Sequence, residues 1–268
     1  MAFELIILGG GQMGGALAEG LVRAHWCAPE ALLVIEPARE RREVLAERLG
    51  GASLAPELAL EHLGAATGVV LCVKPDYAEN TARLAGACGA TRLLSVVAGL
   101  STSRLEAVMA QPVSVVRAMP NTPVLVGRGA SAIAGGAHVT SADLEWAESI
   151  LSAVGSVVRV TERNLDAVTG LSGPMPAYLY LVVEALIEAG VHQGLSREVS
   201  RQLVVDSFAG SAELLARSGQ SPEELRYQVT SPGGTTAAGL RVLEGRGVRA
   251  AFLEAVAAAA ERSRQLGR

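Results

Sequence analysis

The chain has 268 residues, of which 50% are hydrophobic and 19% charged, and its formal net charge is -4. This length and apolar content are sufficient for two modest domains, each with a hydrophobic core. The small net charge argues against a nucleic-acid-binding protein, because that function needs a clustered basic face.

The first half of the sequence alternates short apolar runs with helical segments. In chain order we expect a strand at 3–8, a helix at 12–24, a strand at 32–35, a helix at 39–49, strands at 68–73, 93–97 and 113–118, and edge strands at 130–134 and 157–160. This alternation of strands and helices predicts an α/β domain with a Rossmann-type parallel sheet and helices on both faces.

A G-x-G-x-x-G fingerprint at residues 9–14 lies between the first expected strand and the first expected helix. Glycines there permit a tight turn and a close approach of the backbone to a pyrophosphate, which faces the amino end of the helix. Glu36 ends the second expected strand, where an acid can hold a ribose hydroxyl. The motif alone is weak, but this context favours a dinucleotide site.

Two further loops are expected at the carboxyl edge of the sheet, where parallel sheets bind ligands. Lys74, the single lysine of the chain, ends a strand directly before Pro75. The stiff loop at 119–123 holds Asn121 between two prolines, which is suitable for placing an amide near a nicotinamide. As isolated patterns, both loops also fit ordinary turns without a ligand.

After about Asn164 only helices are expected, at 177–189, 198–216 and 250–266. Ser196 and Ser221 are suitable N-caps. A domain of about a hundred residues cannot bury so much apolar helix surface alone, which favours a second subunit. We therefore predict a dinucleotide-binding domain over 1–162 and an α-helical substrate and dimerisation domain over 163–268.

A second glycine-rich turn at 231–236 precedes a helix that is expected to begin near Thr235. Gly233 and Gly234 leave backbone amides uncovered, and the positive end of the helix favours a small carboxylate. A capped helix start without a ligand is the alternative interpretation of this pattern.

Signals for secretion, membranes and metals are weak. The first four residues include an acid and no basic residue, so no signal peptide is expected. The longest apolar run, 177–187, is interrupted by Glu184 and falls short of the roughly 20 residues of a membrane span. Three cysteines and four isolated histidines lack metal-ligand spacing. We expect a cytoplasmic protein with reduced core cysteines, no metal and no membrane partner.

Six segments of the chain, in this order, resemble the pyrroline-5-carboxylate reductase family. They are residues 9–14, 73–75, 97–99, 117–123, 176–178 and 231–236. The resemblance covers nearly the whole chain, and Met-Pro-Asn-Thr-Pro and Ser-Pro-Gly-Gly-Thr-Thr are its most specific parts. It implies hydride transfer from NADPH or NADH to the C=N carbon of 1-pyrroline-5-carboxylate, which gives L-proline. It also implies a homodimer formed through the helical domain, often assembled further.

The resemblance implies roles for individual residues as well. The expected cofactor contacts, besides Glu36, are Gly9, Gly11, Gln12, Met13, Lys74, Pro75, Ala98, Gly99, Met119, Pro120 and Asn121. The expected substrate contacts are Ser231, Gly233, Gly234, Thr235 and Thr236. Thr236 is the expected catalytic residue, as a hydrogen-bonding or proton-relay group.

The chain departs from the family pattern at Pro174 and Met175, which replace a serine and a glycine, and at Gln228, where an asparagine is common. Reduction of another cyclic imine carboxylate, or dinucleotide binding without turnover, are therefore kept as alternatives. A β-hydroxyacid dehydrogenase is disfavoured because that class uses a C-domain lysine, and no lysine follows Lys74.

Cofactor preference depends on the segment after the second strand. Glu36 repels a 2′-phosphate, whereas Arg39, Arg41 or Arg42 can pair with it. We therefore expect the protein to use both cofactors, with Glu36 restraining the preference for NADPH.

Overall fold

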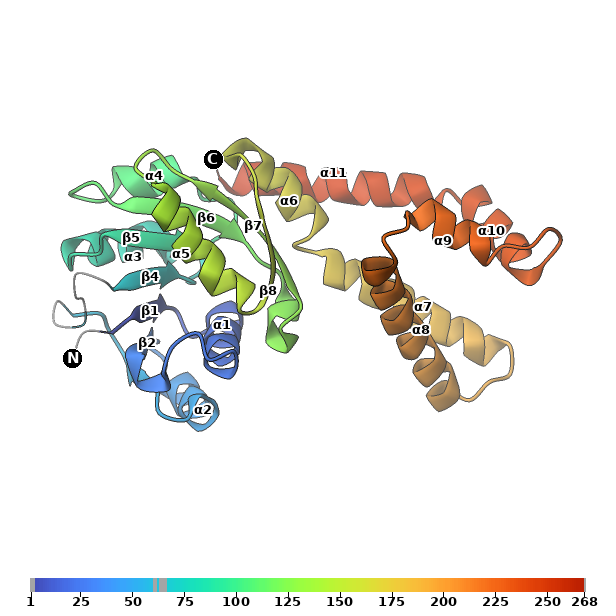
Figure 1. Ribbon diagram of the computed structural model, residues 1–268, viewed down its shortest axis with the longest axis horizontal. Coiled ribbons are helices and arrows are strands. Elements are labelled where there is room, and N and C mark those ends of the chain that lie inside the picture. The colour runs from blue at the N-terminus through green and yellow to red at the C-terminus, as the bar shows by residue number, and fades with distance from the viewer. Residues whose placement is uncertain (1–2, 60–61, 63–66, 268) are drawn as a thin grey trace. The chain divides into compact units, whose positions relative to one another are not determined.

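The sheet of the protein is built from eight strands within the described part of the chain (Figure 1). The structure is a computed structural model that describes residues 3–59, 62 and 67–267. The strands are β1 (Leu5–Leu8), β2 (Leu32–Ile35), β3 (Ser53–Ala55), β4 (Gly68–Leu71), β5 (Arg92–Ser95), β6 (Ser114–Met119), β7 (Gly129–Gly135) and β8 (Gly155–Arg159). Their order across the sheet is β3-β2-β1-β4-β5-β6-β7-β8.

Strands β1 to β6 pair in parallel, β6 pairs antiparallel with β7, and β7 pairs parallel with β8. The predicted parallel arrangement is thus confirmed for β1 to β6, whereas β7 and β8 run in the opposite direction, which the apolar pattern could not reveal. The short strand β3 was not predicted, because its three residues are only half-buried. The strand order reverses between β1 and β4, which is where sheets of this kind bind ligands.

Helices cover both faces of the sheet, which explains why β1, β2 and β4 are buried runs of Leu, Ile and Val. The helices of this part are α1 (Gln12–Arg23), α2 (Arg39–Leu49), α3 (Pro75–Ala87), α4 (Thr102–Ala107), α5 (Ser141–Ser152) and α6 (Leu165–Leu171), with 3-10 turns at Pro29–Ala31, Thr122–Val126 and Glu162–Asn164. One core cluster contains side chains of α1 and α5, and another contains side chains of α3 and α4.

The chain divides into two compact units, Met1–Pro174 with Val256–Arg268, and Met175–Ala255. The remaining helices are α7 (Met175–His192), α8 (Arg197–Ser218), α9 (Pro222–Gln228), α10 (Thr235–Gly245) and α11 (Val248–Leu266), and the last part of α11 belongs to the first unit. The predicted N-caps are confirmed: Ser196 Oγ accepts the Val199 N–H, and Ser221 forms a capping box with Glu224.

Helices α7 and α8 pack against one another, and a side chain on Gly190 would lie only 2.6 Å from Ser200 Oγ. Despite this contact, many apolar side chains of the second unit are exposed. They include Leu181, Leu203, Leu214, Val229, Val242 and Leu253. This unit therefore presents a large apolar surface that calls for a partner.

The helical stretch Glu162–His192 is long and apolar enough, by length and composition, to cross a membrane, and 11% of its most apolar window is buried. The expectation that no segment approaches such a length is thus wrong by this measure. The stretch changes from α6 to α7 around Ser172, and α7 itself carries Glu184 and Glu188. Apolar helices at subunit interfaces of soluble proteins have the same properties, so one such stretch is weak evidence for a span.

The first unit contains three free cysteines, and their thiol reactivity reports how well this unit is packed. Burial raises the pKa of Cys27 to about 11, with a smaller contribution from Glu4, and burial also raises the pKa of Cys72 and of Cys88. Because a raised pKa leaves less thiolate at pH 8, Cys27 should react roughly a hundredfold more slowly than an ordinary thiol. Titration with a chromogenic disulfide should detect little thiol in the native protein and all three thiols in denaturant. A fast stoichiometric reaction in the native state would contradict this.

Candidate functional site

The loop between β1 and α1 needs glycine for two distinct reasons. Gly9 has φ +104°, and a side chain there would lie 2.8 Å from the Cys72 carbonyl oxygen. A side chain on Gly14 would collide with the Gly9 carbonyl oxygen. At Gly11, by contrast, the nearest atom to an added Cβ is Arg41 Nη1 at 3.9 Å. Gly9 and Gly14 therefore make the turn, whereas Gly11 lies on the open side of the loop.

The amino end of α1 presents unpaired backbone amides beside this open side. Gly11 is the N-cap and makes no side-chain cap, and the first turn contains no acidic residue. The first helical hydrogen bond of the loop is donated by the Gly15 N–H to the Gly11 carbonyl, at 2.8 Å. The amides of Gln12 and Met13 thus have no partner within the helix, and they face an anion-binding position.

Glu36 joins this loop to the segment after β2. Its carboxylate is 6% exposed, and its two oxygens accept the N–H groups of Gly10 and Ala38, both at 3.0 Å. The structure therefore gives Glu36 a role that the sequence did not suggest, because it fixes two loops of the site by backbone hydrogen bonds. Each oxygen keeps a further lone pair for a ribose hydroxyl.

The three arginines after Glu36 are not equivalent. Arg39 pairs with Glu43 at 2.9 Å on the exposed side of α2. Arg42 donates to the Glu36 carbonyl oxygen at 2.6 Å, so its guanidinium is used to hold the loop. Arg41 is left as the arginine directed at the glycine loop, with Nη1 4.0 Å from Glu36 Oε2.

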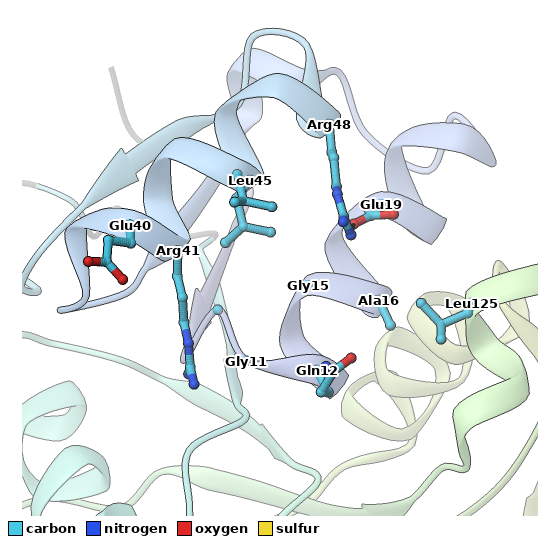
Figure 2. A pocket seen from close by; sticks show the side chains of 12 residues that line it. Gly11, Gln12, Gly15, Ala16, Glu19, Glu40, Arg41, Leu45, Arg48 and Leu125 are labelled. Atoms are coloured by element: carbon cyan, nitrogen blue, oxygen red, sulfur yellow. Dashed lines mark hydrogen bonds and ion pairs between the residues drawn. The ribbon is translucent and has the colours of Figure 1, made fainter.

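A groove of about 320 Å³ lies between α1 and α2. Figure 2 shows Arg41 extending to the Gly11 end of this groove, whereas Arg48 is directed at Glu19, with which it pairs at 3.2 Å. Arg41 is 63% exposed in its side chain, so it can move to meet a ligand. The groove therefore offers one positive group beside the open amides of α1.

A second cavity of about 190 Å³ lies at the carboxyl ends of β1, β2 and β4. It is lined largely by apolar groups, among them Ile35, Pro37, Pro56, Val73 and Leu84. These residues come from segments that are far apart in the sequence, so the sequence pattern alone did not bring them together. Its apolar lining is suitable for an aromatic ring next to the glycine loop.

Lys74 and Pro75 lie at the end of β4. Lys74 is the exposed N-cap of α3, and Pro75 occupies the first helical position, as proline favours. The register pairs Leu8 with Leu71 across β1 and β4, so both strands end at the same level. Lys74 therefore lies at the same sheet edge as the glycine loop, and α3 begins there as α1 does.

The loops after β5 and β6 complete this edge. Gly99 has φ +75°, and it is buried, whereas Ala98 is partly exposed. Asn121 is 8% exposed, its Nδ2 donates to the Ser172 carbonyl at 3.1 Å, and its Oδ1 accepts the Ala130 N–H at 2.9 Å. The Asn121 amide thus holds the loop by hydrogen bonds to two other segments of the same unit.

The second unit contains the other predicted turn. Gly233 has φ +73°, and the Gly234 N–H donates to the Ser231 carbonyl at 3.1 Å. Helix α10 begins at Thr235 with no side-chain cap and no acid in its first turn. Thr235 is exposed and Thr236 partly buried, so amides and hydroxyls gather at one helix end. This end favours a small anion such as a carboxylate.

The predicted residues thus fall into two groups, one in each unit. The first-unit group, at the sheet edge, is Gly9, Gly11, Gln12, Met13, Glu36, Lys74, Pro75, Ala98, Gly99, Met119, Pro120 and Asn121. The second-unit group, at the start of α10, is Ser231, Gly233, Gly234, Thr235 and Thr236. The replacements Met175 and Gln228 lie at the ends of α7 and α9.

Comparisons with known proteins identify the family of the chain. A family model described as pyrroline-5-carboxylate reductase dimerisation matches residues 162–266, and one described as NADP oxidoreductase, coenzyme F420-dependent, matches residues 4–99. The chain is 41% identical to a pyrroline-5-carboxylate reductase from Corynebacterium melassecola, with 98% of each chain covered. The chain belongs to the pyrroline-5-carboxylate reductase family.

Solved structures of this family are similar over their full length. A pyrroline-5-carboxylate reductase from Coxiella burnetii has a TM-score of 0.91 and 30% identity, with 100% of each chain covered. The Plasmodium falciparum pyrroline carboxylate reductase with NADP bound has a TM-score of 0.85 and 33% identity, and the match covers 99% of this chain and 98% of that one. The predicted family, fold class and enzyme class of this pyrroline-5-carboxylate reductase family member are confirmed.

The selection of Arg41 among three arginines leads to a prediction. Arg41→Ala should weaken NADPH binding about tenfold and NADH binding much less, because a charge-assisted contact to the 2′-phosphate is lost. Arg39→Ala is the matched control, since Arg39 is paired with Glu43 and should leave both affinities unchanged. Fluorescence titration of each dinucleotide measures the two dissociation constants. Equal effects of the two substitutions would contradict the assignment.

Proposed function

We propose that the chain reduces 1-pyrroline-5-carboxylate to L-proline, the last step of proline biosynthesis, with NADPH or NADH as the hydride donor. The observation that carries this proposal is the full-length identity of 41% to a named pyrroline-5-carboxylate reductase, in a chain that keeps both amide-rich turns. The assay is oxidation of NADPH or NADH that depends on added 1-pyrroline-5-carboxylate.

The residues of the first unit fit a dinucleotide. The open amides of Gly11, Gln12 and Met13 would hold the pyrophosphate, and Gly9 makes the turn that exposes them. Glu36 would accept a hydrogen bond from the adenosine ribose, and the apolar cavity between the strand ends would take the adenine ring. When bound, the cofactor supplies a hydride.

The remaining first-unit residues would line the rest of the dinucleotide groove, with the last three of them beside the nicotinamide. They are Lys74, Pro75, Ala98, Gly99, Met119, Pro120 and Asn121. The internal hydrogen bonds of Asn121 keep this loop stiff, which supports a role in positioning rather than in proton transfer.

The turn before α10 is proposed to hold the substrate. Ser231, Gly233, Gly234 and Thr235 would bind its carboxylate through amides and hydroxyls. Thr236 would hydrogen-bond to the ring nitrogen, which gains a proton while the C=N carbon gains a hydride. A protonated cyclic imine accepts hydride readily, so alignment and charge neutralisation suffice and no strong base is needed.

We further propose a cytoplasmic homodimer with domains at 1–162 and 163–268. The match of the dimerisation model to residues 162–266 and the exposed apolar side chains of α7 and α8 support the dimer. The proposed partners are a cyclic imine carboxylate and a second copy of the chain, with no nucleic acid and no membrane. The change at Pro174 and Met175 motivates a second substrate in the assay, a six-membered cyclic imine carboxylate.

Thr236→Ala should lower kcat far more than it weakens cofactor binding. Loss of one donor to the reacting nitrogen is worth roughly 2–4 kcal/mol in the transition state. Thr236→Ser keeps the hydroxyl and should retain most of the activity, which separates a chemical role from a packing role. Steady-state kinetics together with a cofactor titration provide the measurement. Kinetics of Thr236→Ala within twofold of the parent would remove this hydroxyl from the mechanism.

Leu181→Glu should reduce dimer formation, because Leu181 of α7 is 67% exposed and a charge opposes burial at an interface. Val44→Glu is the control, because Val44 is another exposed apolar residue, 47% exposed, on α2 of the first unit. Light scattering at micromolar concentration gives the molar mass, and circular dichroism checks that the helices persist. A monomeric parent protein would refute the proposed dimer.

A further inference from the structure

Arg117 is one of two charged side chains that are buried among the described residues, the other being Glu36. It lies on β6, is 5% exposed, and is ion-paired with Glu162 Oε1 at 3.5 Å and with Asp166 Oδ1 at 3.6 Å. An apolar residue would satisfy this position of the sheet without the cost of desolvating a charge. The guanidinium therefore calls for an explanation beyond packing.

Glu162 connects Arg117 to Thr102 at the start of α4. Its Oε1 accepts the Thr102 N–H at 2.7 Å, and its Oε2 accepts the Thr102 hydroxyl at 2.6 Å. Thr102 follows Gly99 by three residues, and both are buried. Glu162 thus fixes the segment after β5 from its carboxyl side.

Asp166 connects Arg117 to Ser263 of α11. Its Oδ1 accepts the Ser263 hydroxyl at 2.7 Å, and the end of the same helix packs on Gly99. A side chain on Gly99 would lie 2.9 Å from Leu266 Cβ and 3.2 Å from Gly267 N. The end of α11 therefore contacts the segment after β5, which Glu162 also holds through Thr102.

Arg104 of α4 completes this arrangement. Its Nη1 donates to the Gly267 carbonyl oxygen at 2.9 Å, and its Nη2 pairs with Glu79 of α3 at 2.7 Å. The Ala98–Gly99 segment is thus held between two elements, α4 and α11, and each of them is tied to Arg117 through one carboxylate.

We propose that Arg117, with Glu162 and Asp166, is a positioning centre that sets the Ala98–Gly99 segment in its binding conformation before the dinucleotide arrives. This inference rests on the proposed function, in which that segment lines the cofactor site. A segment that is fixed in advance costs less conformational entropy on binding. The planar guanidinium suits this task because it can face two carboxylates from two different elements at fixed angles.

The test removes single links of the centre and leaves Arg117 in place. Thr102→Val removes the hydroxyl that bonds to Glu162, and Ser263→Ala removes the hydroxyl that bonds to Asp166. Each should raise the dissociation constant of NADPH about fivefold in the absence of substrate, because the segment must then be ordered on binding. Thr102→Ser should restore tight binding. Isothermal titration calorimetry on the full-length protein gives the constants.

Thr140→Val is the matched control. Like Thr102, Thr140 lies at the start of a helix of the first unit and donates its hydroxyl to a carboxylate, Asp143, at 2.7 Å, but its helix is α5. It should lower the thermal midpoint and leave the NADPH constant unchanged. An equal loss of NADPH affinity in the control, or unchanged affinity in both test variants, would overturn the positioning role. Failure of the parent protein to bind NADPH would instead overturn the proposed function, and the inference with it.

Discussion

The two backbone hydrogen bonds that the Glu36 carboxylate accepts hold together the part of the protein on which the dinucleotide site depends. Gly10 precedes the N-cap of α1, and Ala38 is the N-cap of α2, and neither helix has a side-chain cap. One carboxylate therefore supplies acceptors beside the positive ends of two helices. This explains how a nearly buried negative charge is tolerated: it is met by two N–H donors and by two helix ends.

The second buried charge, Arg117, lies on β6, whereas Glu36 follows β2 on the opposite flank of β1 in the sheet. Arg117 has two carboxylate partners, at distances that give ion pairing rather than short hydrogen bonds. Those carboxylates in turn accept short hydrogen bonds from Thr102 and Ser263. The buried side chains of the strands are otherwise mainly aliphatic, and such side chains pack without defining the direction of a loop. Charged groups are used where loops must be fixed, because hydrogen bonds are directional and apolar contacts are not.

Local patterns predicted the elements that local chemistry determines. The bounds of α2, Arg39–Leu49, were predicted correctly, and so were the N-caps Ser196 and Ser221. The direction of β7 was not predictable from its apolar run. It follows instead from the connection after β6, which contains a 3-10 turn at Thr122–Val126 and is too short for a parallel crossover.

The site was predicted at the level of segments but not of contacts. Motifs placed the glycine loop and the turn before α10 because each is continuous in sequence. The partners of Arg117 are Glu162 and Asp166, which lie more than forty residues away, and nothing in the local pattern marks them. The internal hydrogen bonds of Asn121 depend on Ser172 in the same way. Such long-range polar pairs arise from topology, which no local pattern encodes.

The two units differ in how many of their side chains they bury within themselves. Within the described residues, strands β1, β2 and β4 of the sheet unit are buried throughout, whereas α9 and α10 contain no buried residue and α8 buries only Ser200. Helices of this kind gain little stability from propensity alone, and most of it must come from packing an apolar face. The apolar surface of α7 and α8 is therefore not incidental: without a partner, the second unit lacks the burial that a helical domain needs. In the proposed dimer, the stability of this unit is linked to its association and therefore depends on protein concentration.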